Sequence, residues 1–190
     1  MKVTIGVSNR HVHLTKEHLE ILFGEDAVLE KSRDLNQPGQ YASTSKVTIA
    51  TDKSSIEEVR VLGPTRPYTQ VEISMTDAYK LGLKPPVRPS GKLKGSAPIT
   101  LIGPKGTVLL EQGCIVADRH IHITPEQMQT FGLEGLAEVK VRLDGEKGGI
   151  LDHVELKVAD ASYFELHLDM DDANAHLVQN GSEGEIILEK

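Results

Sequence analysis

An eight-residue motif occurs twice in this chain and constrains the fold more than any other feature. Residues 10–17 read RHVHLTKE, and residues 119–126 read RHIHITPE, 109 positions later. A weaker repeat relates residues 71–78, VEISMTDA, to residues 166–173, LHLDMDDA, with an offset of 95. Two repeats in the same order within 190 residues predict two similar structural units, each of them small.

Short runs rich in Val, Ile and Thr make up much of the remaining sequence. Gly, Pro, Asp and Lys separate them, as around residues 46–50 (KVTIA), 59–62 (VRVL) and 99–102 (ITLI). Because no long helical segments lie between these runs, a parallel sheet of alternating strands and helices is disfavoured. The sequence therefore predicts a mainly β fold with two small β-barrel domains, related by an internal duplication and carrying short capping helices.

Four short helices are predicted, over residues 16–23, 76–81, 125–131 and 171–179. Thr15 and Thr124 precede two of them, and a threonine hydroxyl accepts hydrogen bonds from the free N–H groups of a first helical turn. Gly24 and Gly132 follow the same two helices, where a left-handed backbone favours glycine.

Composition excludes several classes of protein and indicates a cytoplasmic one. The formal net charge is −7, which gives no general attraction to nucleic acid or to anionic lipid. The single cysteine, Cys114, has no partner for an internal disulfide, and it is expected to pack in the core. Neither a signal peptide nor a membrane-spanning apolar run is present, so no membrane association is expected, and a homo-oligomer is compatible with these observations.

Both copies of the motif contain His-x-His, which in an extended segment presents two imidazoles on one face. The weaker repeat supplies a third candidate ligand for each pair, and three protein ligands with an open position are typical of catalytic zinc sites. The sequence therefore predicts two metal sites, one formed by His11, His13 and Glu72 and the other by His120, His122 and His167.

Other interpretations of these residues exist. A single His-x-His pair is as readily a pair of hydrogen-bonded or solvated histidines, and duplication reduces the weight of that interpretation. Glu17 and Glu126 also fit a His-x-His-x3-Glu spacing, but acidic residues are favoured in the first turn of a helix, and we expect that role for both.

Arg66 lies in a turn rich in Gly and Pro, six residues before Glu72. A guanidinium at this position could hold phosphate through bidentate hydrogen bonds, or it could be a solvated loop arginine.

The sequence resembles the PduL-type phosphate acyltransferases, also called phosphotransacylases or phosphate propanoyltransferases, over nearly the whole chain. The motifs that carry the resemblance are SNRHVHL at residues 8–14, QPGQ at 37–40, GPTR at 63–66 with TQVE at 69–72, ADRHIH at 117–122, and His167 with DANA at 172–175. The resemblance implies a short-chain acyltransferase that converts propanoyl-CoA or acetyl-CoA and phosphate into acyl phosphate and CoA.

The resemblance also implies how the parts divide. One β-barrel domain would comprise residues 10–117, and the other residues 118–190 completed by an N-terminal strand within residues 1–9. Two zinc ions would occupy the two predicted triplets, and Arg66 would hold phosphate as a catalytic residue. Coenzyme A would contact Ser8, Arg33, Arg60, Leu62, His167 and Asn174. The chain begins almost directly at the first strand, which favours a freely cytoplasmic enzyme over one encapsulated in a microcompartment.

Three rival functions account for part of the pattern. A metal-dependent hydrolase also uses His-x-His near a first strand, but its barrel typically needs about 250 residues. A bicupin-like metal-binding protein would need a downstream Pro-x-Gly-x2-His element, which follows neither motif. A zinc-binding module without enzymatic activity leaves Arg66 unexplained.

Overall fold

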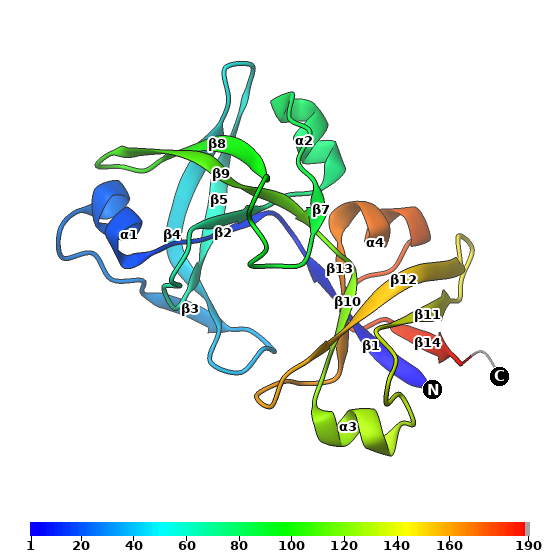
Figure 1. Ribbon diagram of the computed structural model, residues 1–190. Coiled ribbons are helices and arrows are strands. Elements are labelled where there is room, and N and C mark those ends of the chain that lie inside the picture. Colours follow the sequence, from blue (N-terminus) through cyan, green and yellow to red (C-terminus); the bar gives the residue numbers. More distant parts are fainter. Residues whose placement is uncertain (189–190) are drawn as a thin grey trace. The chain divides into compact units, whose positions relative to one another are not determined.

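The computed structural model describes residues 1–188, which are mainly β-strand with short helices (Figure 1). The chain divides into two compact units. The first barrel is formed by residues 10–117, and the second barrel by residues 1–9 together with the chain from residue 118 onward. The mainly β fold with barrels and short helices that the sequence predicts is confirmed.

The first barrel closes through the strand order β4-β5-β2-β6-β9-β8, and the described chain adds β3 beside β4 and β7 beside β9. Its strands are β2 (His11–His13), β3 (Lys31–Asp34), β4 (Tyr41–Ala50), β5 (Ser55–Gly63), β6 (Gln70–Glu72), β7 (Val87–Arg88), β8 (Ala97–Ile102) and β9 (Thr107–Ala117). The short β2 lies between β5, to which it is parallel, and β6, to which it is antiparallel.

The second barrel closes through the order β1-β13-β10-β12-β11-β14. Its strands in the described chain are β1 (Lys2–Ser8), β10 (His120–Ile123), β11 (Glu138–Leu143), β12 (Gly149–Val158), β13 (Glu165–Asp169) and β14 (Glu183–Ile187). Here β10 lies between β12, to which it is parallel, and β13, to which it is antiparallel.

The two barrels correspond strand by strand. Going around the ring, the order in the first barrel is β9, β6, β2, β5, β4, β8, and the corresponding order in the second barrel is β1, β13, β10, β12, β11, β14. Each pair of neighbouring strands in the first barrel has the same parallel or antiparallel sense as the corresponding pair in the second. Ile115 on β9 pairs with Glu72 as Gly6 on β1 pairs with His167. Strand β1, near the N-terminus, therefore completes the barrel whose other strands come from residues 120–187.

Four helices occur within residues 1–188: α1 (Lys16–Phe23), α2 (Met75–Leu81), α3 (Pro125–Thr130) and α4 (Met170–His176). Thr15 and Thr124 cap α1 and α3 as predicted, each accepting a hydrogen bond from the third residue of its helix. The expected helix over 171–179 starts one residue earlier and ends three residues earlier. Leu177 adopts a left-handed backbone (φ 53°) and its N–H caps the helix, which stops it at His176.

Each barrel has its own apolar core, and the residue between the two histidines of each motif belongs to it. Val12 and Ile121 are both fully buried, with 0% of their surface exposed. Alternation along the strand then places both histidines of each motif on the opposite face. None of the helices in the described chain has the length and apolar character that a membrane crossing requires.

Candidate functional site

Strand register brings His11, His13 and Glu72 together on the first barrel. His11 pairs with Glu72 and His13 with Gln70 across the β2–β6 ladder, and ligand atoms of the three residues lie within 4.8 Å of one another. His11 Nε2 lies 3.4 Å from Glu72 Oε2, and the two imidazole rings meet edge to face at 5.1 Å. We call these three residues the first cluster.

The second cluster consists of His120, His122 and His167 on the second barrel. His120 pairs with His167 across the β10–β13 ladder, and ligand atoms of all three again lie within 4.8 Å. His120 Nε2 lies 3.2 Å from His122 Nε2. His120 Nδ1–H donates to the carbonyl of Asp118 at 2.7 Å, which leaves Nε2 with its lone pair directed to the cluster.

One pair of ligand atoms in each cluster has the separation expected in a tetrahedral metal shell. Two ligands at the usual zinc bond length of about 2.0–2.1 Å, at a tetrahedral angle, lie about 3.3 Å apart. The distances of 3.4 Å in the first cluster and 3.2 Å in the second match that separation. Imidazole nitrogen and carboxylate oxygen are also ligands that zinc accepts, so the residues fit the ion that the family resemblance implies.

Arg66 lies in the loop between β5 and β6, where its backbone N–H donates to the carbonyl of Leu14 at 2.8 Å. Its guanidinium donates to Gln40 Oε1 at 3.0 Å and to Ser90 Oγ at 3.5 Å, and both acceptors are neutral. Among the residues that the structure describes, no carboxylate forms an ion pair with Arg66. Its positive charge therefore remains available to an anion.

Hydrogen bonds connect Arg66 to the first cluster. Ser90 Oγ accepts from Arg66 and also, at 2.8 Å, from the amide of buried Gln70. That amide donates in turn to Glu72 Oε1 at 2.5 Å. The guanidinium and the cluster thus belong to one hydrogen-bonded network, although they come from different segments of the chain.

An arginine–aspartate ion pair stands beside each cluster. Arg10 Nε donates to Asp77 Oδ2 at 2.8 Å, and Arg119 Nη2 donates to Asp172 Oδ1 at 3.1 Å. Each arginine immediately precedes its His-x-His motif, and each aspartate lies in the first turn of the helix that follows the third cluster residue. Each pair links the residue before the His-x-His strand to the helix that follows the strand of the third cluster residue. The hydrogen bond to Asp77 raises the pKa of Arg10.

The residues expected to contact coenzyme A divide between the barrels. Arg60 and Leu62 lie on β5 in register with His11 and His13. Exposed Arg33 lies on β3, which pairs with β4, and β4 in turn pairs with β5. The others lie on the second barrel: Ser8 at the end of β1, His167 on β13, and exposed Asn174 on α4. The binding of coenzyme A by these six residues stays a prediction.

Several acidic and thiol side chains fall outside the clusters. Glu17 and Glu126 are exposed in the first turns of α1 and α3, the helical role expected of them. Cys114 is fully buried on β9, and burial, with a contribution from Asp77, raises the pKa of its thiol to about 12. Such a thiol stays protonated near neutral pH, which makes it a poor nucleophile.

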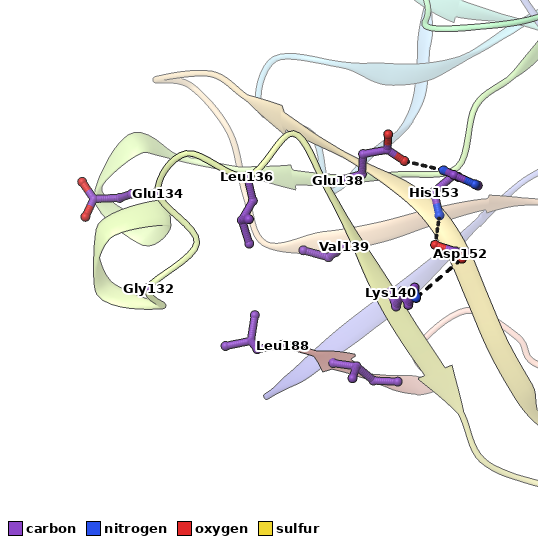
Figure 2. A pocket seen from close by; sticks show the side chains of 10 residues that line it. Gly132, Glu134, Leu136, Glu138, Val139, Lys140, Asp152, His153 and Leu188 are labelled. Atoms are coloured by element: carbon purple, nitrogen blue, oxygen red, sulfur yellow. Dashed lines mark hydrogen bonds and ion pairs between the residues drawn. The ribbon is translucent and has the colours of Figure 1, made fainter. Parts of the chain in front are cut away.

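A groove of about 570 Å³ on the second barrel is a separate feature (Figure 2). Leu136, Val139 and Leu188 line it together with charged side chains, among them Glu138, which accepts from His153 at 2.7 Å. The described residues that line it include none of the predicted site residues, so the groove is separate from both clusters.

Sequence reasoning missed the polar residues that surround the clusters. Gln40, Gln70 and Ser90 support Arg66 and Glu72, while Tyr163 and Glu165 contact His167. Two motifs gave a signal for some of them, since QPGQ at residues 37–40 carries Gln40 and TQVE at residues 69–72 carries Gln70. The rest depend on the register of strands that the sequence does not reveal.

Comparison with known proteins identifies the family. The model of the phosphate propanoyltransferase family matches residues 4–179. A phosphate propanoyltransferase of Thermotoga maritima is 48% identical over 180 residues, which cover 94% of this chain and 86% of the relative. One of Rhodopseudomonas palustris is 45% identical over 179 residues, covering 94% of this chain and 79% of the relative. The chain therefore belongs to the phosphate propanoyltransferase family of acyltransferases.

Proposed function

We propose that this chain is a phosphate acyltransferase that interconverts a short-chain acyl-CoA and phosphate with acyl phosphate and CoA. Family membership supports the reaction, and the observation that carries its assignment to these residues is the pair of three-residue clusters able to hold a metal ion, one of them linked to Arg66. In the forward direction a phosphate oxygen bonds to the thioester carbonyl carbon. The carbon–sulfur bond breaks, and its electron pair leaves with the sulfur of CoA.

Two zinc ions are proposed, one held by His11, His13 and Glu72, and one by the three histidines of the second cluster. When bound, zinc supplies Lewis-acid chemistry that polarises a carbonyl oxygen and stabilises a departing thiolate. The protein's own residues supply the positions. Because each His-x-His lies on a strand hydrogen-bonded on both sides, the imidazoles are held by the barrel rather than by a loop.

Arg66 is the residue proposed to bind and orient phosphate. A planar guanidinium pairs two N–H groups with two phosphate oxygens, and this geometry limits the directions from which a third oxygen can attack. Its neutral partners Gln40 and Ser90 fix the guanidinium without cancelling its charge. Phosphate and the acyl group are thereby aligned before the reaction, which lowers the entropic part of the barrier.

Direct transfer of the acyl group to phosphate is proposed, with no covalent acyl-enzyme. Buried Cys114 retains its proton because its pKa is raised to about 12. We expect Cys114→Ser to keep most of the activity and to lower the free energy of unfolding by about 1–3 kcal/mol, because a hydroxyl is less well accommodated in an apolar core. Thermal melting and steady-state kinetics measure the two effects. Complete loss of turnover in a folded, zinc-loaded variant would restore a covalent mechanism.

The substrate preference between propanoyl-CoA and acetyl-CoA is proposed to be modest. The two acyl groups differ by one methylene, which an apolar pocket discriminates by only about 1–3 kcal/mol. We therefore propose activity with both thioesters.

Phosphate-dependent thiol release tests the proposed reaction. Purified protein is mixed with propanoyl-CoA or acetyl-CoA, and free thiol is followed with and without phosphate. Release that requires phosphate and yields acyl phosphate supports the transferase. Equal release without phosphate supports the metal-dependent hydrolase, and no release under either condition supports a metal-binding protein without activity, as in a bicupin-like or zinc-binding module.

Metal analysis of the same preparation is expected to give two zinc ions per chain, because each barrel carries one cluster. Elemental analysis after zinc loading and dialysis provides the measurement. A content of one ion or fewer after zinc supplementation contradicts the two-site proposal, whatever the activity.

A further inference from the structure

The residue two positions before the third member of each cluster shares its face of the sheet. These residues are Gln70, before Glu72, and Glu165, before His167, and their exposed fractions are 0% and 5%. Both are also cross-strand partners of the second histidine in the motif: Gln70 pairs with His13, and Glu165 with His122. The two barrels therefore place an amide and a carboxyl group at corresponding positions.

Gln70 is fixed in one orientation by its own hydrogen bonds. Its Oε1 accepts from the backbone N–H of Gly91 at 2.7 Å, so its amide nitrogen must be the atom that faces Ser90 and Glu72. The amide donates to Glu72 Oε1 at 2.5 Å. The other oxygen, Oε2, is the one that lies 3.4 Å from His11 Nε2. Glu72 is thus held with one oxygen bound by an amide and the other directed to the first cluster.

Glu165 reaches His167 through the hydroxyl of Tyr163. That hydroxyl lies 2.6 Å from His167 Nε2 and also hydrogen-bonds to Glu165, whose Oε2 is 3.5 Å from the same Nε2. With the Glu165 carboxylate as acceptor, Tyr163 O–H donates to it, and the Tyr163 oxygen accepts from His167 Nε2–H.

The position of the Tyr163 hydroxyl also bears on which ring nitrogen of His167 can bind an ion. A metal on Nε2 would lie about 2.0 Å along the direction of the N–H bond. The Tyr163 oxygen already lies on that side, 2.6 Å from Nε2. Nδ1 is therefore the ring atom left for the ion, whereas the hydrogen bond of His120 to Asp118 leaves Nε2 in that histidine.

The neighbouring strand makes room for Glu165. Gly6 on β1 pairs with His167, and a Cβ atom at Gly6 would lie 2.9 Å from Cδ of Glu165, closer than real contacts allow. The corresponding position in the first barrel is Ile115, which has a full side chain. The space occupied by the Glu165 carboxyl thus depends on a glycine in the second barrel.

We propose that Gln70 and Glu165 are the positioning residues of the two clusters, each matched in hydrogen-bond polarity to the third ligand. Gln70 donates a hydrogen bond to the carboxylate of Glu72. Glu165, acting through the Tyr163 hydroxyl, provides an acceptor for the imidazole N–H of His167. As a result, Glu72 would bind its zinc ion through Oε2, and His167 would bind its zinc ion through Nδ1. The inference rests on the proposed function in one respect, namely that both clusters bind zinc.

The zinc affinity of matched variants tests whether Gln70 and Glu165 position the third ligand of each cluster through hydrogen bonds of the right polarity. Q70E replaces a donor by an acceptor, and E165Q replaces a carboxylate that only accepts by a neutral amide that also donates, each at nearly constant volume. Each is expected to weaken zinc binding in its own barrel by about 10–100-fold, as is typical when the hydrogen-bond partner of a ligand is changed, and to leave the other barrel unchanged. Chelator competition measures the second cluster in a full chain carrying His13→Ala, and the first cluster in one carrying His122→Ala.

E138Q is the matched control, because Glu138 pairs with His153 at 2.7 Å on the same barrel but both side chains are largely exposed and outside the clusters. It is expected to leave zinc affinity unchanged. Y163F provides a second variant if E165Q fails to fold, and it is expected to weaken the second cluster by a similar factor. Unchanged zinc affinity in folded E165Q or folded Y163F overturns the role of Glu165, and unchanged affinity in Q70E overturns that of Gln70.

Nitrogen-15 NMR of the zinc-loaded protein with labelled histidine tests the assigned ligand atom. The His167 signals are identified by their loss in His167→Gln. We expect a proton on Nε2 and zinc on Nδ1, and zinc on Nε2 overturns the assignment. These readouts do not depend on turnover. A chain that binds zinc in this way but gives no phosphate-dependent thiol release contradicts only the proposed reaction, whereas a chain that binds no zinc contradicts both.

Discussion

Arg66→Ala is expected to lower kcat/KM for phosphate on the order of 10²–10³-fold, the effect typical of removing a preorganised donor to a reacting group. The structure gives the reason: the guanidinium is held by neutral Gln40 and Ser90, so its charge is available to an anion. Zinc content should not change, because Arg66 belongs to neither cluster. Steady-state kinetics with varied phosphate and metal analysis measure both quantities.

Two further variants make that result specific. Arg66→Lys keeps the charge but loses the planar fork, so its kcat/KM should lie between those of the wild type and Arg66→Ala. Arg142→Ala removes a half-exposed arginine whose charge already pairs with Glu185 and Asp144 on the second barrel, and it should have no effect on phosphate kinetics. Wild-type phosphate kinetics in Arg66→Ala would remove this residue from the site.

Glu72→Gln is expected to release zinc from the first cluster and to suppress acyl transfer by at least about 10²-fold. An amide is a weaker ligand than a carboxylate, and the neighbouring Gln70 amide is oriented to donate to a carboxylate at this position. The metal content should fall from two zinc ions per chain to one after dialysis against a mild chelator. Elemental analysis and the thiol-release assay give the two readouts.

The second cluster acts as an internal control for this variant, because its three histidines belong to the other barrel. Glu57→Gln is a matched external control, since Glu57 is exposed on β5 of the same barrel. It should retain both ions and full activity. If Glu72→Gln kept two tightly bound ions, the assignment of Glu72 as a ligand would be wrong.

Local pattern was sufficient to predict which histidines face the same way, whereas long-range pairing decided what surrounds them. Because side chains alternate between the two faces of a strand, His11 and His13 point to one face and Val12 to the other. The repeat of the motif at residues 10–17 and 119–126 can be read directly from the sequence. The contacts of Gln70 with Ser90, by contrast, join segments 20 residues apart, and no periodicity encodes them. Ligation of metal by either cluster stays a prediction.

The sequence predicted neither strand β3 nor the point at which helix α4 ends. All four residues of β3 are exposed, so the strand lacks the apolar alternation that would have indicated it. The end of α4 depends on Leu177, an apolar residue in a left-handed conformation that usually favours glycine or asparagine. In both cases the surrounding fold overrides the local preference of the residues.

The placement of β1 in the second barrel sets an order of events during synthesis. Its neighbours in the barrel are β13 and β14, so residues 2–8 leave the ribosome long before residues 165–187 exist to pair with them. At about 5–20 residues per second this delay is roughly 10–40 s. The first barrel contains all of its own strands and can close within that time. Until residues 165–187 have been synthesised, residues 2–8 lack both of their partner strands, which leaves this segment open to chaperones and to pairing with other nascent chains.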